Sequence, residues 1–518
     1  MKCVFAIGLL LIVTGGCGRH IFHSPALETA LVQAGANRAE LESVLDHYRD
    51  RDDELKLRAA RFLIENMEGH SYVTFALYDS AGAEVDLDVL AHPDYDALIA
   101  AVDSIEAQRG ELDYERRLIR PDLATMTADL LIENIDLAFR AWREMPWARH
   151  LSFEDFCAYV LPYRGSNEPL ESWRGHFLQR YADLPTNLED PTDPIAAARA
   201  INQDLKSWFG FDPRFYLHPT DQGLCEMRST RLGRCEDMTN ITIYAMRAMG
   251  LAVTSDYTPF WANAGNNHAW NAILDKDGRA VIFMGCEADP GQYRLHNRLA
   301  KAYRKTYAQQ PDNLVFRVPE GEKVPPWLRG KNYIDVTPDY QEVRDVVLAV
   351  DPPPPDSIHF AYLCVFNSGN WEAVHWGQIV GRSVTFTDMG LEIAYLPAYY
   401  MDDEFVPLGP AFVLEADGTI RPLTADPARP IMLQLRASTR SETVSDTDGI
   451  RKVELAPGMS YELHYWRDEW VALGRAVAGT DPIEFSAVPS GGLYWMVAEE
   501  SRKDERIFTY EEDRQIWW

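Results

Sequence analysis

The chain has 518 residues, of which 46% are hydrophobic, enough material for several separately packed domains. Its 79 acidic residues outnumber its 50 basic residues and give a formal net charge of -29 at pH 7. A field of this sign repels phosphate backbones and no basic stripe offsets it, so we do not expect nucleic acid as a partner.

Residues 1–17 are predicted to be an export signal that lies outside the fold. A positive start is followed by the apolar run Val4 to Val13, which is too short to span a bilayer. Small residues then precede Cys17, and the whole segment resembles a bacterial lipoprotein signal. That resemblance implies lipidation of Cys17 and a protein anchored in the bacterial cell envelope, at the outer membrane or periplasmic face. The alternative is an ordinary secretory signal, which would make the protein secreted.

Residues 18–185 are predicted to form a helical domain, because apolar residues recur there with helical spacing. Asn37 with Glu40 three residues later, and Ser152 with Asp155, are typical of helix N-caps. Prolines and acidic residues from 185 to 194 then mark a domain boundary.

Residues 190–326 mix helical and strand patterns and are predicted to form an α+β domain. Apolar positions from Met238 to Met249 follow a period close to 3.6, so a helix is expected to begin near Cys235 and to end before Gly250. The first turn of a helix stabilises an anion, which favours a reactive thiolate at Cys235.

A β-hairpin is predicted to begin at His268. The segments "HAWNAIL" and "AVIFMG" flank the turn sequence "DKDG". A histidine on the first strand of a hairpin is held rigidly, as a general base must be. Cys235 and His268 are therefore candidates for a nucleophile and its base.

A cysteine that opens a helix, then "HAW" opening a hairpin, then an acid beyond the second strand, resembles the transglutaminase-like superfamily of papain-type cysteine enzymes. The resemblance covers about residues 194–290, and the order Cys, His, Asp is the family's order. It implies that Cys235 is the nucleophile and His268 the base of an acyl-transfer reaction. The whole arrangement also resembles transglutaminase-domain lipoproteins of bacteria.

The third catalytic residue departs from the family pattern. The family's Asp would fall near Met284 or Gly285, and neither side chain can orient a histidine. We therefore expect Glu287 to orient His268, with Asp289 as the second choice.

The loop ahead of His268 is predicted to bind substrate through aromatic walls and amides. Its candidate residues, together with one that follows the histidine, are Tyr257, Trp261, Asn267 and Trp270. The alternative is a loop packed by its own aromatic residues. Gln222, upstream of the cysteine, is a weaker candidate for an oxyanion hole.

The C-terminal third is predicted to be all-β, in two sandwich-like units over residues 334–426 and 427–518. Short β-rich runs alternate there with Pro, Gly, Asn and Asp, and Asp417-Gly418 is typical of a hairpin turn. Tryptophans of these units could bind sugar faces or fill cores; they are Trp371, Trp376, Trp466 and Trp470.

Seven cysteines are present, and five lie beyond the leader. Their spacing contains no CxxC pair and no zinc-binding cluster, so we expect no metal and no cofactor. At least one thiol is expected to be free, and a Cys225–Cys286 disulfide stays open.

The expected fold is thus a multidomain α+β protein with a helical domain, a transglutaminase-like core and two all-β units. The expected function is a cysteine-dependent acyl-transfer enzyme of the cell envelope that hydrolyses amide bonds in peptides, proteins or glycopeptides. The alternative is a catalytically inactive transglutaminase-like scaffold that binds protein or glycan through its β units.

Overall fold

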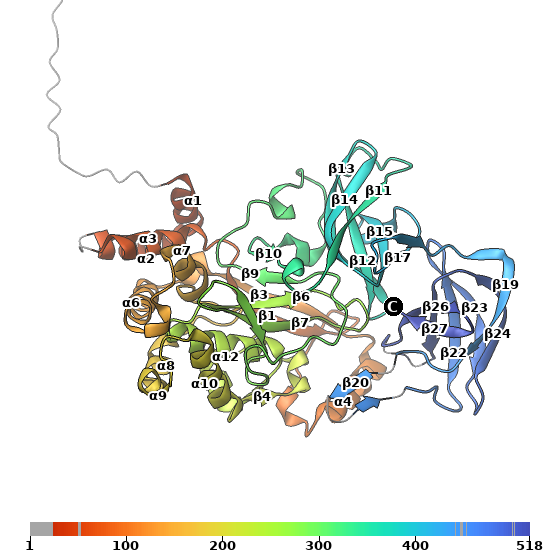
Figure 1. Ribbon diagram of the computed structural model, residues 1–518, viewed down its shortest axis with the longest axis horizontal. Helices are drawn as coiled ribbons and strands as arrows, with labels where there is room; N and C mark the ends of the chain where they lie inside the picture. The colour runs from red at the N-terminus through yellow and green to blue at the C-terminus, as the bar shows by residue number, and fades with distance from the viewer. Residues whose placement is uncertain are drawn as a thin grey trace, which may run out of the picture.

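The structure, a computed structural model, describes residues 24–49, 53–440, 442–445, 449–451, 453–499, 501 and 503–518. The predicted leader and Cys17 therefore lie outside the described residues. The molecule is elongated, with helices at one end, a central sheet, and the C-terminal strands at the other end (Figure 1). None of the described helices combines the length and the apolar character needed to cross a membrane.

The helices of the N-terminal region bury one apolar face each. In α2, Arg38–Arg49, that face is Leu41, Val44, Leu45 and Tyr48, as the period of 3.6 predicts. The predicted capping box is not formed among the described residues, because Glu40 accepts from the Ala128 N–H at the start of α6, and the Asn37 amide nitrogen donates to the carbonyls of Leu123 and Met126. These bonds tie α2 to the segment before α6. The helices of this region are α1 Pro25–Gln33, α2, α3 Glu54–Glu65, α5 Asp122–Thr125 and α6 Ala128–Glu144.

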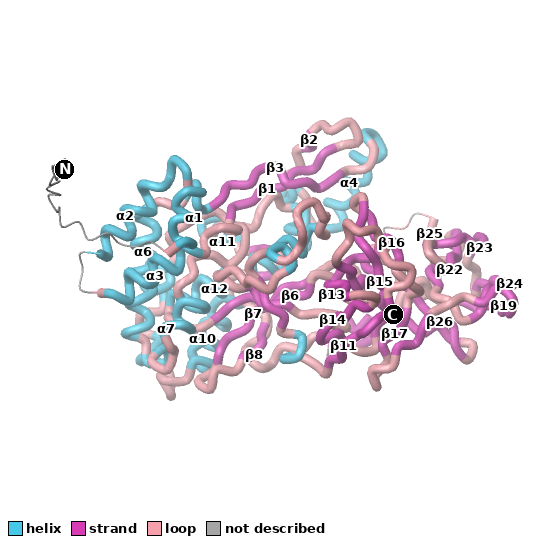
Figure 2. Tube along the Cα trace, turned by 90° about the horizontal axis from the view of Figure 1, so that it is seen from above, coloured by secondary structure: helices cyan, strands magenta, loops and turns pink. Residues whose placement is uncertain are grey.

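This region also contains a three-stranded antiparallel sheet that was not predicted. Its strands are β1 Ser71–Tyr78, β2 Glu84–Val85 and β3 Asp113–Pro121, in the order β2-β1-β3, with α4 Tyr95–Arg109 beside them (Figure 2). Strand β3 is almost wholly exposed, so its sequence lacks the alternation of apolar and polar residues that marks a half-buried strand.

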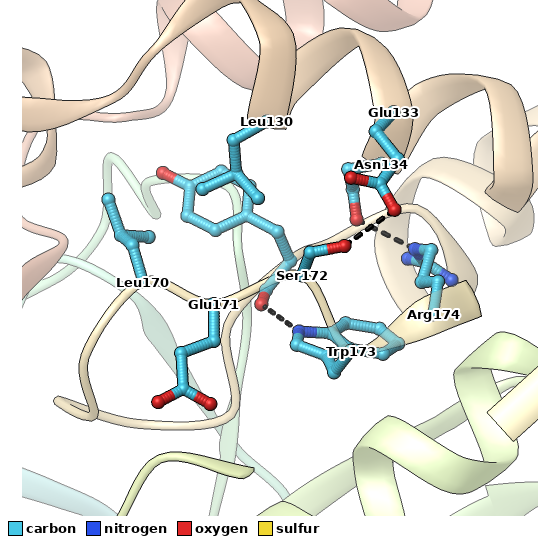
Figure 3. A pocket seen from close by; sticks show the side chains of 9 residues that line it. Leu130, Glu133, Asn134, Leu170, Glu171, Ser172, Trp173 and Arg174 are labelled. Atoms are coloured by element: carbon cyan, nitrogen blue, oxygen red, sulfur yellow. Dashed lines mark hydrogen bonds between the residues drawn. The ribbon is translucent and has the colours of Figure 1, made fainter. Parts of the chain in front are cut away.

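The segment after α6 is held by a local helix cap and by side-chain bonds to other helices. Ser152 and Asp155 form the predicted capping box at the start of α7, Phe153–Asp155. Further on, the Arg174 guanidinium at the start of α8, Arg174–Arg180, donates to Asn134 on α6 at 2.7 Å (Figure 3). The same guanidinium donates to the Arg247 carbonyl at 2.9 Å, which joins the helical region to the central domain.

A five-stranded sheet in the order β10-β9-β6-β7-β8 forms the centre of the molecule. Helix α12, Cys235–Ala248, packs against β6 and β7, and Gly250 ends it in the left-handed conformation with φ 73°. One hydrophobic core runs from Leu27 to Val336 and includes both the N-terminal helices and this sheet. The other elements of the centre are α9 Leu184–Asn187, α10 Pro194–Lys206, α11 Leu224–Thr230, β4 Gly210–Phe211, β5 Leu232–Gly233, β6 Val253–Thr258, β7 His268–Leu274, β8 Ala280–Phe283, β9 Tyr303–Lys305 and β10 Tyr333–Asp335.

The first C-terminal unit is an eight-stranded sheet that curls into a half-barrel (Figure 1). Asp417-Gly418 forms the turn of its last hairpin, as predicted, with Gly418 at φ 85°. Its strands are β11 Val343–Ala349, β12 Phe360–Asn367, β13 Asn370–Val380, β14 Ser383–Gly390, β15 Ile393–Met401, β16 Glu404–Pro407, β17 Phe412–Leu414 and β18 Ile420–Pro422.

The second unit joins a five-stranded sheet to the pair β19–β24 through a shared apolar core. Trp371 of the first unit packs edge to face on Trp466 of the second at 5.5 Å, and both are buried. These two tryptophans therefore fill a core between the units. The strands of the second unit are β19 Asp426–Leu435, β20 Glu442–Ser445, β21 Gly449–Arg451, β22 Ser460–Trp466, β23 Trp470–Val477, β24 Ile483–Ser490, β25 Tyr494–Ala498, β26 Ile507–Glu511 and β27 Arg514–Trp517.

Candidate active site

Cys235 is the first residue of α12, as the sequence predicts, and it is 5% exposed. Its thiol donates to the Glu236 carboxylate, with 3.2 Å between Sγ and Oε2. The backbone N–H of Ala269, the second residue of β7, donates to the sulfur. This contact places the thiol beside the start of the strand that carries His268.

His268 opens β7, and its ring clusters with two tryptophans. The ring centroids of Trp261 and Trp270 lie 5.9 Å and 5.8 Å from that of the imidazole, and 6.5 Å from each other. The histidine Nε2 is 2.7 Å from the hydroxyl of Tyr293. Contact with the two tryptophans and a hydrogen bond at one nitrogen hold the ring in one orientation.

Glu236 and Tyr293 connect the cysteine to the histidine electrostatically. Burial is the main cause of the raised pKa of Cys235, and the Glu236 carboxylate raises it further. Burial lowers the pKa of His268, and the same carboxylate opposes this fall. Burial raises the pKa of the Tyr293 phenol, and the charges of Glu287 and of an ionised Cys235 raise it further. The four side chains therefore lie within electrostatic reach of one another.

The thiol and the imidazole are both biased toward their neutral forms. Burial disfavours the charged state of each, raising the pKa of Cys235 and lowering that of His268. In the part of the chain that the structure describes, no hydrogen bond joins these two side chains. The arrangement is therefore a protonated cysteine bonded to an acid, beside a neutral histidine bonded to a tyrosine.

Neither acid expected to orient His268 lies against it. Glu287 is exposed, and among the described residues no hydrogen bond or ion pair joins its carboxylate to the imidazole. Its backbone carbonyl accepts a bond from Lys206 at 2.6 Å. Asp289 accepts bonds from Asn202 and Gln203 on α10, at 3.1 Å and 3.0 Å. Both residues therefore face α10 or solvent.

Tyr293 stands where the expected acid would act, although no sequence pattern predicts this role for it. The expectation fell on acids just beyond the second hairpin strand, whereas Tyr293 lies four residues past Asp289 in an irregular segment. The one available signal was an aromatic hydroxyl in the same stretch, "GQYRL", which is too common to single out.

The usual position of the family's Asp is closed to any side chain here. A Cβ at Gly285 would lie 2.2 Å from the Thr242 hydroxyl and 2.7 Å from the Asn271 amide oxygen. The Gly285 N–H donates to that same oxygen at 3.2 Å. Asn271 and Thr242 thus occupy the space, and Gly285 is required by close packing.

The sequence profile described as Transglutaminase-like superfamily matches residues 182–283. This match takes in Cys235, His268 and the hairpin, and it ends before Glu287 and Tyr293. The chain contains a transglutaminase-like superfamily domain. No curated protein matches the sequence significantly. Among solved structures, the crystal structure of red sea bream transglutaminase aligns at 8% identity over 88% of this chain and 78% of that chain, with a TM-score of 0.19.

The predicted substrate-binding residues of the transglutaminase-like domain divide into two groups. Trp261 and Trp270 cluster with His268, and Asn267 is exposed beside it. Trp270 is fully buried and donates to the Tyr340 hydroxyl at 2.8 Å, so it supports the ring and is not open to a ligand. Tyr257 instead packs against Tyr303 and lines a different cavity.

Gln222 is committed to structural bonds. Its side-chain amide donates to the Leu232 carbonyl at 2.9 Å and accepts from the Thr230 hydroxyl at 2.8 Å. Its backbone N–H donates to Asp237. Burial, with help from Asp221, raises the pKa of Asp237 to about 6. Gln222 therefore braces the start of α12, and both the nitrogen and the oxygen of its amide are bonded to the segment between Thr230 and Leu232.

The loop before His268 is clamped by both C-terminal units. The amide of Asn367, at the end of β12, donates to the carbonyls of Trp261, Ala264 and Asn266 at 2.9 to 3.1 Å. The guanidinium of Arg506 in the second unit donates to the carbonyls of Ala262 and Ala264. The wall of the candidate site thus depends on residues far along the chain.

No group of three or more His, Cys, Asp or Glu side chains that could hold a metal occurs among the described residues. All five described cysteines are free thiols, so the Cys225–Cys286 disulfide considered from the sequence is not formed. Cys225 is exposed, and the other four are buried.

Proposed function

We propose that the protein is a cysteine-dependent acyl-transfer enzyme that hydrolyses amide bonds in peptides, proteins or glycopeptides of the bacterial cell envelope. The observation that carries the proposal is the pairing of His268 with Tyr293 beside a cysteine at a helix N-terminus. A transglutaminase-like domain is consistent with cysteine-dependent acyl transfer. The lipid anchor at Cys17 and the envelope location belong to the same proposal and rest on the leader sequence.

The hydrogen bond to Tyr293 is compatible with the tautomer that a base needs. When His268 Nε2–H donates to the tyrosine oxygen, Nδ1 is left with a free lone pair. That nitrogen takes the proton of Cys235 as the sulfur attacks the acyl carbon. Because burial lowers the pKa of His268, the imidazole is neutral and able to accept a proton near pH 7.

Formation of the thioester requires that Glu236 release the thiol. The carboxylate now accepts the thiol hydrogen and opposes a negative sulfur. A substrate carbonyl entering between the sulfur and the first turn of α12 would displace it. Backbone N–H groups at that turn then stabilise the oxyanion. The C–N bond breaks, the amine leaves with the proton from His268, and water releases the acid.

The experiment acylates the full chain with 4-nitrophenyl acetate and maps the adducts by peptide mass spectrometry. Attack by Cys235 forms an S–acyl bond and releases 4-nitrophenolate, and exposed Cys225 serves as the internal reference. We expect an adduct at Cys235 that is lost in His268→Ala, while acetylation of Cys225 is unchanged. Added glycinamide then separates the two outcomes, since transfer to the amine would make transamidation the main activity.

The second candidate is a catalytically inactive scaffold that binds protein or glycan through its β units. The bond from the Cys235 thiol to Glu236 favours it, because a neutral, buried thiol is a poor nucleophile. Acetylation of Cys225 with no adduct at Cys235, in wild type and in His268→Ala alike, would support the scaffold and rule out the enzyme.

A further inference from the structure

A polar cavity lies where the helical region, the central sheet and the segment before β10 meet. Its volume is about 250 Å³, smaller than the sites that hold drug-sized ligands. Four cationic side chains line it, and the lining contains no carboxylate. The chain as a whole carries a net charge of -29, so the charge of this lining is opposite in sign to that of the protein. The four cations are Arg164, Arg247, Lys305 and Lys331.

Two of the cations are already neutralised by acids behind the wall. Arg164 forms a buried ion pair with Asp122 at 2.5 Å, and Lys331 pairs with Glu68 at 2.6 Å. Their charge is balanced inside the protein, so they contribute mainly shape and hydrogen-bond donors.

Arg247 and Lys305 have no carboxylate within ion-pair distance among the described residues. Arg247 is 4% exposed and donates through Nε and Nη1 to backbone carbonyls, which leaves Nη2 without a bond. Burial lowers the pKa of Arg247 to about 10, and Glu168 opposes the fall, so the side chain is still charged near pH 7. A buried cation that forms no ion pair is stabilised further when a counter-charge binds beside it.

Lys305 is the more accessible of the two. Its ammonium donates to the Ser166 hydroxyl at 3.1 Å and lies 5.9 Å from the centroid of the Tyr257 ring. Both contacts leave donors free on the ammonium, which carries three. Asn167 and Asn332 add amides to the lining. The cavity thus offers two unpaired charges and several neutral donors.

We propose that this cavity binds a small oxyanion, a phosphate or a short carboxylate, between Arg247 and Lys305. The site is separate from Cys235, because Arg247 lies twelve residues further along α12, about 18 Å at 1.5 Å per residue. The inference does not rest on the proposed acyl transfer. A bound anion would join two segments distant in sequence, at Arg247 and Lys305, and so would also stabilise the fold.

The test is isothermal titration calorimetry of the full chain with inorganic phosphate and, separately, with succinate. Wild type is expected to bind at least one of them with a Kd of about 1 mM or tighter. Lys305→Gln keeps a donor for Ser166 but removes the charge, and should weaken binding about tenfold or more. The matched control is Lys276→Gln, an exposed lysine in the turn after β7, which should bind like wild type.

Preference for phosphate or for succinate identifies the source of the oxyanion. Absence of heat from both probes with wild type would overturn the proposal, as would equal affinity of Lys305→Gln and wild type. Unchanged circular dichroism of Lys305→Gln excludes loss of folding as the cause of weaker binding.

Discussion

Glu236 holds the Cys235 thiol in its protonated form, so Glu236→Gln should make this cysteine more reactive. At 3.2 Å, the repulsion between a carboxylate and a thiolate is about 1.3 kcal/mol in bulk water and about 5 kcal/mol at an effective dielectric constant near 20. Glu236 is half-buried, which places the effect in the lower part of that range. We expect the thiol pKa to fall by about 1 to 2 units at about 1.4 kcal/mol per unit.

The thiolate of a more acidic thiol is also a weaker nucleophile, with a Brønsted slope of about 0.4 to 0.5. The rate of alkylation below the thiol pKa should therefore rise by about 3- to 16-fold, less than the rise in thiolate. The assay is iodoacetamide labelling across pH, read by peptide mass spectrometry, with exposed Cys225 as the reference in each sample. The rate at Cys225 should not change.

The matched control is Glu287→Gln, which removes an exposed acid that makes no contact with the thiol. It should leave the Cys235 rate within about twofold of wild type, because Glu287 is exposed to solvent, where a charge is largely screened, and it does not shift the pKa of Cys235. The reasoning would be refuted by equal acceleration in both variants, which would indicate a general field, or by no acceleration in Glu236→Gln.

Three further predictions concern distant supports of the site and the stability of the β units. Tyr293→Phe should slow acylation of Cys235 by about tenfold or more, because His268 loses the hydrogen bond that orients its ring, while the free energy of unfolding changes by about 1.5 kcal/mol or less. An unchanged acylation rate would remove Tyr293 from the mechanism. Arg506→Met leaves the buried Ala262 carbonyl without its donor, while Ala264 keeps its bond from Asn367, and should cost about 1 to 3 kcal/mol in urea unfolding and slow acylation, whereas exposed Arg514→Met should do neither. Burial raises the pKa of Glu372 to about 7, so the protonated form stabilises the fold below about pH 4.5 and that stabilisation is lost as the pH rises through 7. The free energy of unfolding of Glu372→Gln should match that of wild type at about pH 5 and exceed it by about 2 kcal/mol at about pH 8. Equal free energies of the two proteins at both pH values would contradict this reasoning.

The sequence by itself determined the local elements that carry the candidate site. The helix beginning at Cys235 and the hairpin beginning at His268 follow from short-range patterns, namely a period of 3.6 and a "DKDG" turn, and both are confirmed. The transglutaminase-like superfamily domain is likewise shown over residues 182–283. Such patterns act over a few residues, so a single sequence is sufficient to read them.

Only the tertiary structure decided which side chains meet around the cysteine and the histidine. Tyr293 reaches His268, and Glu287 does not, because the chain beyond β8 turns toward α10 and leaves the hairpin register. The loop before His268 is held by Asn367 and Arg506, about 100 and 240 residues away in sequence. Contacts between irregular segments depend on how whole domains pack, and no periodic pattern in the sequence records that packing.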